Sequence, residues 1–224
     1  TITVTPTLTN GSQSCSGTSR TFTITVNPSG VVNAVSNQVV CAGATNDSVS
    51  FSSTVAGTTY SWTNSRPSIG LASSGSGPVP SFVAVNSSPN DITATITVTP
   101  NTPEGCVGEA ITYTITVNGL SVAPSSIINP TPIVCVNNAF TTLSVNGGAL
   151  GSGASWKWYA DSLSTVSIGS GATLSNIPVA KTTTYFVRAE GTCNNTAAAS
   201  VVVQRANLVS HVRQHWNDVL LFDN

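Results

Sequence analysis

The sequence predicts an all-β chain of tandem antiparallel β-sandwich modules, and two observations support that prediction. Apolar residues alternate with threonine over long stretches, which is the pattern of strands with one buried and one solvated face. A threonine-rich segment also occurs twice, at a spacing typical of a sandwich module of about 100 residues. Charged residues make up only 7% of the chain, against about 25% in ordinary soluble domains. Hydroxyl and amide side chains therefore supply most of the polar surface.

The repeated segment contains two strands and a loop. Residues 1–28 read TITVTPTLTNGSQSCSGTSRTFTITVNP, and residues 95–119 read TITVTPNTPEGCVGEAITYTITVNG. Each copy has a TITVTP run, a loop with one cysteine, and a second run that ends in TITVN. Two alternating runs joined by a loop rich in turn residues predict a β-hairpin. The copies start 94 residues apart (95 − 1), which suits a sandwich module and not a shorter solenoid repeat.

The spacing of the repeat predicts how the chain is divided. We expect residues 29–119 to form a complete sandwich, with strands at 31–35, 49–53, 59–64, 69–72, 79–86, 92–99 and 111–118. A second, more diverged sandwich is expected over 120–205, with strands at 141–145, 155–160, 172–177, 183–190 and 197–204. Residues 1–28 are expected to be the C-terminal hairpin of a truncated repeat. Residues 206–224 are expected to be a linker and the first strand of a following truncated domain.

The five cysteines predict a disulfide framework. They lie far apart, with no CxxC pair and no nearby histidine, which excludes the usual zinc and thioredoxin-like spacings. Three landmarks align between the modules: Cys41 with Cys135, Trp62 with Trp158, and Cys106 with Cys193. We therefore expect the intramodular disulfides Cys41–Cys106 and Cys135–Cys193, formed outside the cytoplasm. They would close spans of 65 and 58 residues (106 − 41 and 193 − 135), each stabilising its module by about 4 kcal/mol. Cys15 is expected to be unpaired in this fragment.

Several classes of function find no support in the sequence. The formal net charge is −1 and no basic stripe occurs, so we expect no nucleic-acid partner. No apolar run approaches the roughly 20 residues that span a bilayer. The acidic residues are scattered and no nucleophile motif is present, so we expect no catalytic residue, no cofactor and no enzyme activity. His211 and His215 have the i, i+4 spacing of a metal site but lack a third ligand, and we interpret them as linker residues.

The densest aromatic cluster, Trp156, Trp158 and Tyr159, has two interpretations. In a strand the two tryptophans would share one face and the tyrosine would lie on the other. Filling the core of the sandwich is the favoured interpretation. The alternative is a platform on which carbohydrate rings stack, and this alternative requires that Trp156 be exposed to solvent.

The threonine-rich TITVTP…C…TYTITVN strands, the VCxG-like openings and the WxWY run resemble the PKD-like and Ig-like repeats of Bacteroidota cell-surface adhesins. That family includes gliding-motility adhesins and other cargo of the type IX secretion system. The resemblance implies a tandem Ig-like/PKD-like architecture and an extracellular protein attached to the outer membrane at the cell surface. It also implies O-glycosylation at Asp-Ser-aliphatic triplets, which places candidate sites at Ser48 and Ser162.

The function that the resemblance implies is a structural and adhesive stalk. Its expected partners are the neighbouring repeats of the same chain, surface glycans, and the secretion or motility machinery. An alternative also fits the modules, namely that they are accessory or carbohydrate-binding modules of a secreted multidomain enzyme. Dozens of further repeats in the whole polypeptide would favour the adhesin, whereas a single catalytic domain would favour the enzyme.

Overall fold

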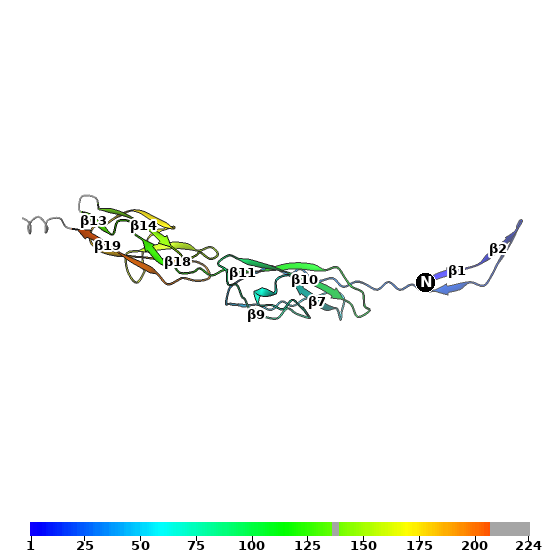
Figure 1. The fold of residues 1–224 in the computed structure, drawn as a ribbon. Coiled ribbons are helices and arrows are strands. Elements are labelled where there is room, and N and C mark those ends of the chain that lie inside the picture. The colour runs from blue at the N-terminus through cyan, green and yellow to red at the C-terminus, as the bar shows by residue number, and fades with distance from the viewer. Residues whose placement is uncertain (136–138, 207–224) are drawn as a thin grey trace, which may run out of the picture.

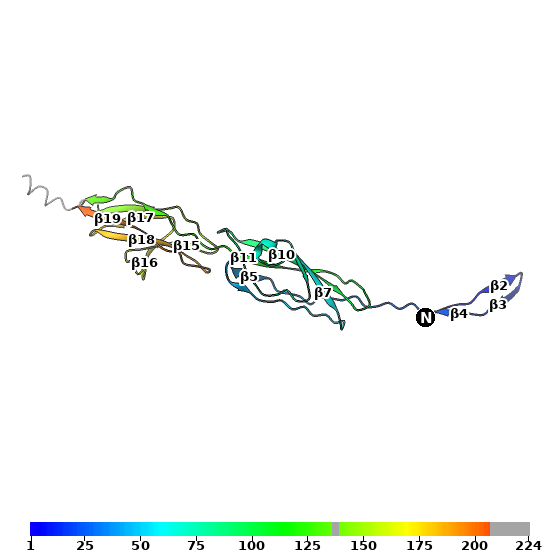
Figure 2. The same cartoon turned by 60° about the horizontal axis from the view of Figure 1, so that its bottom comes forward.

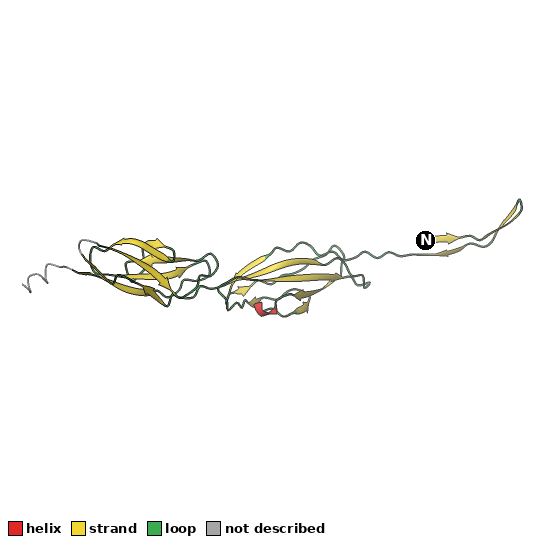
Figure 3. Ribbon diagram, turned by 45° about the horizontal axis from the view of Figure 1, so that its top comes forward, coloured by secondary structure: helices red, strands yellow, loops and turns green. Residues whose placement is uncertain are grey.

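The computed structural model describes residues 1–135 and 139–206. An N-terminal hairpin, a first β-sandwich (module 1) and a second β-sandwich (module 2) follow one another along the chain (Figure 1). In these residues the regular structure is almost entirely strand, and one short 3-10 helix, η1 (Pro67–Ile69), interrupts it (Figure 3). The predicted all-β fold class is confirmed.

The N-terminal hairpin has the same strand register as the last two strands of module 1. β1 (Ile2–Val4) pairs with β4 (Arg20–Phe22), and β2 (Thr7–Asn10) pairs with β3 (Gln13–Ser16). Ile2 lies opposite Phe22, as Ile96 lies opposite Tyr113 in module 1. The apolar side chains of the hairpin are exposed, whereas their module 1 equivalents are buried. The two copies of the repeat therefore form the same local structure in different surroundings.

Module 1 has a five-stranded sheet in the order β5-β11-β10-β7-β8 and a two-stranded sheet of β6 and β9. The strands are β5 (Gln38–Cys41), β6 (Thr45–Asn46), β7 (Thr59–Asn64), β8 (Ser74–Ser76), β9 (Phe82–Val83), β10 (Ile92–Asn101) and β11 (Ile111–Asn118). Every pairing in the larger sheet is antiparallel except that of β5, which runs parallel to β11. Figure 2 shows β5 at one edge beside β11.

Module 2 repeats this topology with a larger second sheet. Its five-stranded sheet has the order β13-β19-β18-β15-β16, and β13 is again parallel to β19. A three-stranded sheet, β12-β14-β17, covers the other face. The strands are β12 (Ser126–Ile128), β13 (Ile133–Cys135), β14 (Phe140–Asn146), β15 (Ser155–Tyr159), β16 (Ser167–Ser170), β17 (Thr173–Pro178), β18 (Thr183–Glu190) and β19 (Ala199–Ala206).

The cores follow from the alternation of apolar residues with threonine. In β10 and β11 the inward side chains after the first residue of each strand are buried, while the threonines between them face outward. The central residues of the two cores are Trp62, Ile69, Ile96, Val98, Ile115 and Val117 in module 1, and Leu143, Trp158, Val179, Val187 and Val203 in module 2. A slip of one residue would expose each buried face, so the pattern also determines the register.

Three predicted strands of module 1, at 31–35, 49–53 and 69–72, are wrong, and of 79–86 only Phe82–Val83 is strand. Residues 49–53 contribute one isolated bridge, Val49 with Val79. Residues 31–35 form no ladder, and the Val31 backbone N–H donates to the Ser53 hydroxyl at 3.2 Å. Residues 69–72 include the end of η1 instead of a strand. Pro67 opens that turn, and Gly70 closes it with a φ of 99°, in the left-handed region that glycine tolerates best. At 31–35 and 69–72, side-chain and turn interactions take the place of the pairing that the apolar pattern predicts.

Candidate functional site at the junction between the modules

The predicted disulfide pairs are wrong, because the two cysteines of each pair lie at opposite ends of their module. Cys41 lies opposite Asn118, the last residue of β11, whereas Cys106 lies in the loop before β11 begins. Eight residues of strand separate those ends by roughly 23 Å, while disulfides join Cα atoms less than about 7 Å apart. The parallel pairing of β5 with β11 causes this separation, and sequence alignment of the cysteines does not reveal it.

The same correction applies to the predicted Cys135–Cys193 pair. Cys135 lies opposite Ala206 at the end of β19, whereas Cys193 lies in the loop before β19. The observed disulfide instead joins Cys41 of module 1 to Cys193 of module 2, with Cα atoms 5.5 Å apart. Cys15, Cys106 and Cys135 have no disulfide partner. The cysteine chemistry of this chain therefore lies at the junction between modules.

The linker at this junction, residues 119–121, is held from both sides. The Gly119 N–H donates to the Asp91 carboxylate of module 1 at 3.0 Å, and the Gly119 carbonyl accepts from the Ser152 N–H of module 2 at 3.3 Å. A Cβ at Gly119 would overlap the carbonyl oxygen of Pro89. Glycine is therefore required here for the close approach of two backbones.

A second set of hydrogen bonds fixes the start of module 2 next to the disulfide. The Asn194 side chain accepts from the Ser121 N–H at 2.9 Å and donates to the Ser121 carbonyl at 3.0 Å. The Ser121 hydroxyl accepts from the Gly151 N–H at 2.9 Å, and Ser121 is 7% exposed. Because Asn194 directly follows Cys193, these bonds position the disulfide loop against the linker.

The aromatic cluster fills the core of module 2, so the carbohydrate-platform interpretation of Trp156 is wrong. Trp156 is 7% exposed and Trp158 is fully buried. The Trp158 indole N–H donates to the Gly171 carbonyl at 2.8 Å, which satisfies its polar group. Tyr159 is also buried, although strand alternation places it on the outer face. Side chains from β18 cover it there.

The cover over Tyr159 is a small charged cluster on the outer face of β15 and β18. The Tyr159 hydroxyl donates to Glu190 at 2.5 Å, and the Arg188 guanidinium pairs with the same carboxylate at 2.6 Å. The guanidinium also lies 5.2 Å from the centre of the tyrosine ring. The hydrogen bond from Tyr159 lowers the pKa of Glu190, and pairing with Arg188 lowers it further. Burial and the same hydrogen bond raise the pKa of Tyr159.

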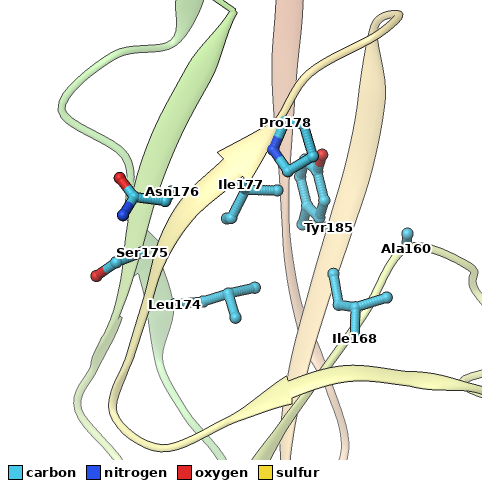
Figure 4. Close-up of a pocket in the computed structure, with 8 residues that line it drawn as sticks. All are labelled: Ala160, Ile168, Leu174, Ser175, Asn176, Ile177, Pro178 and Tyr185. Atoms are coloured by element: carbon cyan, nitrogen blue, oxygen red, sulfur yellow. The ribbon is translucent and has the colours of Figure 1, made fainter.

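Module 2 also has an apolar cavity of about 330 Å³ at one edge of the sandwich. Leu174, Ile177 and Ile168 point into it, and Tyr185 closes its back wall (Figure 4). The polar residues of its rim, Ser175 and Asn176, project away from the cavity (Figure 4). No carboxylate, imidazole, amine or thiol lines it. Its lining therefore offers apolar contact surface and no acid–base pair.

The remaining predicted sites lie apart from the junction. Ser48 and Ser162, the candidate O-glycosylation sites, are both exposed, the first beside β6 and the second in the turn after β15. His211 and His215 lie outside the described residues. In residues 1–135 and 139–206 no group of three or more His, Cys, Asp and Glu side chains could hold a metal ion.

Comparisons with known families define the class of the two modules. Residues 38–120 match the family described as PKD-like domain, and residues 121–205 match the family described as Ig-like domain, CHU_C associated. Residues 38–205 thus form a PKD-like domain and an Ig-like domain in tandem. No curated protein matches the chain.

Chains of several Ig domains are among the solved structures that align with this chain. The N-terminal eight Ig domains of Down Syndrome Cell Adhesion Molecule align over 81% of this chain and 27% of that chain, at 13% identity and a TM-score of 0.45. Extracellular domains 3–5 of Drosophila OTK align over 87% and 67%, at 12% identity and a TM-score of 0.44. A titin segment aligns over 88% and 72%, at 12% identity and a TM-score of 0.48. This chain spans 27% of the length of that eight-domain chain and 52% of the length of a four-domain Dscam1 chain.

Proposed function

We propose that this chain is part of the structural and adhesive stalk of a large secreted bacterial cell-surface adhesin. The observation that supports this proposal best is the junction. A linker of three residues, five hydrogen bonds and one disulfide hold two sandwiches end to end. Such a junction suits a spacer that must keep its length and direction, because it removes the bending freedom that ordinary linkers leave between domains.

The proposed location is the outside of the cell. A structural disulfide persists in oxidising compartments and is rare in the reducing cytoplasm. In the described residues no helix is long and apolar enough to cross a membrane. The outward faces of the strands carry threonine and few charges, which gives a polar surface that depends little on ionic strength.

We extend the proposal to export by the type IX secretion system and to a role in surface adhesion or gliding motility. The support is the sequence resemblance of these modules to repeats of such cargo, together with the CHU_C-associated Ig-like domain. The proposed partners are neighbouring repeats, surface glycans, and the secretion or motility machinery. O-glycosylation is proposed at Ser48 and Ser162, whose exposure leaves both hydroxyls accessible to a transferase.

The experiment that tests this function uses the bacterium that makes the protein. Antibodies against residues 29–206 should label intact wild-type cells and should fail to label cells that lack a type IX secretion component. Deletion of the coding region should reduce attachment to glass or cell spreading. Label that remains inside wild-type cells, or attachment and spreading unchanged by the deletion, would contradict the proposal.

The alternative, that these are accessory modules of a secreted enzyme, makes a different prediction for the same strains. The deletion would then abolish a hydrolytic activity in the medium and leave attachment unchanged. Peptide mapping of the whole polypeptide also distinguishes the adhesin from the enzyme, because the enzyme needs a catalytic domain in the same chain. Mass spectrometry of tryptic glycopeptides from wild-type and Ser48→Ala chains tests the proposed modification directly.

A further inference from the structure

The three cysteines without a partner occupy the same positions in their modules as the two that are bonded. We propose that Cys135 and Cys106 each form a disulfide with an adjacent module, so that Cys41–Cys193 is one link of a continuous series along the repeat array. In each link, one cysteine comes from the edge strand that runs parallel to a module's last strand. It bonds the cysteine that precedes the last strand of the next module. This inference rests on the proposed repeat array, because it requires modules on both sides.

Cys135 occupies the position of Cys41. Each lies at the end of the edge strand that runs parallel to the last strand of its module. Cys41 pairs with Asn118 and Cys135 pairs with Ala206, and both of these are the last residue of an eight-residue strand. The chain leaves each module from the end of that strand. Cys135 is exposed at this exit end of module 2, the position from which Cys41 of module 1 bonds Cys193 of the following module.

Cys106 and Cys15 occupy the position of Cys193. Cys106 lies five residues before β11 (111 − 106), Cys15 lies five residues before β4 (20 − 15), and Cys193 lies six before β19 (199 − 193). Cys106 and Cys193 are in the loop before a strand that closes the hairpin, and Cys15 is in β3, the short strand before β4.

That loop lies where the chain enters its module. In module 2 the incoming Ser121 is bonded to Asn194, next to Cys193. In module 1 the incoming Gly30 lies so close to Gly108, two residues after Cys106, that a Cβ on Gly108 would overlap the Gly30 carbonyl. Cys106 therefore faces the module that precedes it, as Cys193 faces module 1.

Each link forms by ordinary thiol–disulfide exchange with a protein disulfide oxidant of the extracytoplasmic space. The Cys135 thiolate attacks the oxidant's disulfide, which forms a mixed disulfide and releases one thiolate of the oxidant. The thiolate of the neighbouring module then attacks the Cys135 sulfur, which forms the link and releases the second thiolate. Two thiols of the array lose two protons and two electrons, and the oxidant leaves as a dithiol.

The series changes which part of the array carries a pulling force. A disulfide that joins adjacent modules bypasses most of both, since Cys41 and Cys193 are 152 residues apart. With every link present, force passes from a link to Cys106, through 29 residues to Cys135 (135 − 106), and on to the next link. That path holds β11, the linker and the first strands of module 2. A parallel path through the Cys41–Cys193 link holds β5 and β19. The strands outside both paths, β6 to β10 and β14 to β18, stay folded under load.

The inference is tested by mapping disulfides in the full polypeptide purified from its own secretion compartment, with free thiols blocked before digestion. Cleavage after acidic and basic residues separates all five cysteines onto different peptides, with cuts after Arg20, Asp47, Glu104, Glu109, Lys157, Glu190 and Arg205. We expect the Cys135 peptide to be joined to a peptide that precedes the last strand of the following module. We expect the Cys106 peptide to be joined to a first-strand peptide of the preceding module.

Several results would overturn the inference. Cys135 or Cys106 recovered as a blocked free thiol, joined to each other, or joined within its own module would each contradict it. If further repeats are present and these cysteines are free, the proposed series of disulfides is wrong, whereas the proposed stalk function is unaffected. If the full polypeptide holds no further repeat on either side of residues 29–206, both fail. A Cys135→Ser variant should expose one new reactive thiol, in the following module, and the matched Cys41→Ser variant should expose only Cys193.

Discussion

Pulling the chain by its two ends should reveal a large shielded length that only a reductant releases. The Cys41–Cys193 bond encloses 152 residue steps. At about 3.3–3.6 Å per extended residue, it hides roughly 500–550 Å of contour length when both modules unfold. We expect single-molecule force curves in oxidising buffer to lack this length, and the same curves with a thiol reductant to show it.

The same measurement separates the observed disulfide from the intramodular pairs. Bonds Cys41–Cys106 and Cys135–Cys193 would hide 65 and 58 residues as two separate lengths of roughly 200 Å each. A reductant-dependent release in two such steps, or no dependence on reductant, would refute the reasoning. Cys193→Ser should release the full length without reductant, whereas the matched variant Cys135→Ser should behave as wild type, because Cys135 has no partner in this chain.

Loss of this disulfide should also lower stability. On the chain-entropy model, closing a loop of 152 residues contributes about 5 kcal/mol to the free energy of unfolding. Chemical denaturation of wild type and Cys193→Ser measures that difference. An unchanged denaturation midpoint would show that the two modules unfold independently of their covalent link.

Three further predictions concern the modules themselves. Gly75→Ala should destabilise module 1 by about 1–3 kcal/mol in thermal unfolding, because the added methyl overlaps the buried Trp62 indole; the neighbouring exposed change Ser76→Ala should be near neutral. The pKa of Glu190 is lowered in the folded state. The stabilisation that its carboxylate gives the folded state is therefore fully present above the ordinary carboxyl pKa of about 4.3, and it is lost as pH falls through the lower pKa of the folded state. The stability difference between wild type and Glu190→Gln, about 1 kcal/mol near neutral pH, should therefore vanish on acidification; a difference that persists at low pH would contradict this. Asn194→Ala removes two hydrogen bonds to Ser121 and should widen the range of inter-module angles seen by residual dipolar couplings, with the disulfide retained.

Alternation in the sequence was sufficient to predict three inner strands of the five-stranded sheets. β7 and β11 span the residues that the pattern predicts, 59–64 and 111–118, and β18 spans 183–190. Each of these strands has a neighbour on both sides, so one of its faces is buried along most of its length. Burial then imposes a period of two on every side chain, and that period is visible without a structure.

The edge strands were harder to predict because they bury little. β12, β13 and β16 have three or four residues and mostly exposed side chains, so they leave no alternating signal. The burial of Tyr159 is a second feature that the sequence pattern does not predict. Its position in the strand predicts an exposed side chain, and only the neighbouring strand shows that Arg188 and Glu190 cover it.

The sequence by itself determined that the chain is built of repeated β-sandwiches and which cysteines correspond between modules. Only the tertiary structure decided which cysteines bond. Correspondence in sequence says that Cys41 and Cys135 have the same role, but not at which end of the sandwich each lies. That depends on whether β5 pairs parallel or antiparallel with β11, a long-range choice that no local pattern encodes. The parallel pairing places Cys41 at the exit of module 1, within reach of Cys193 and away from Cys106.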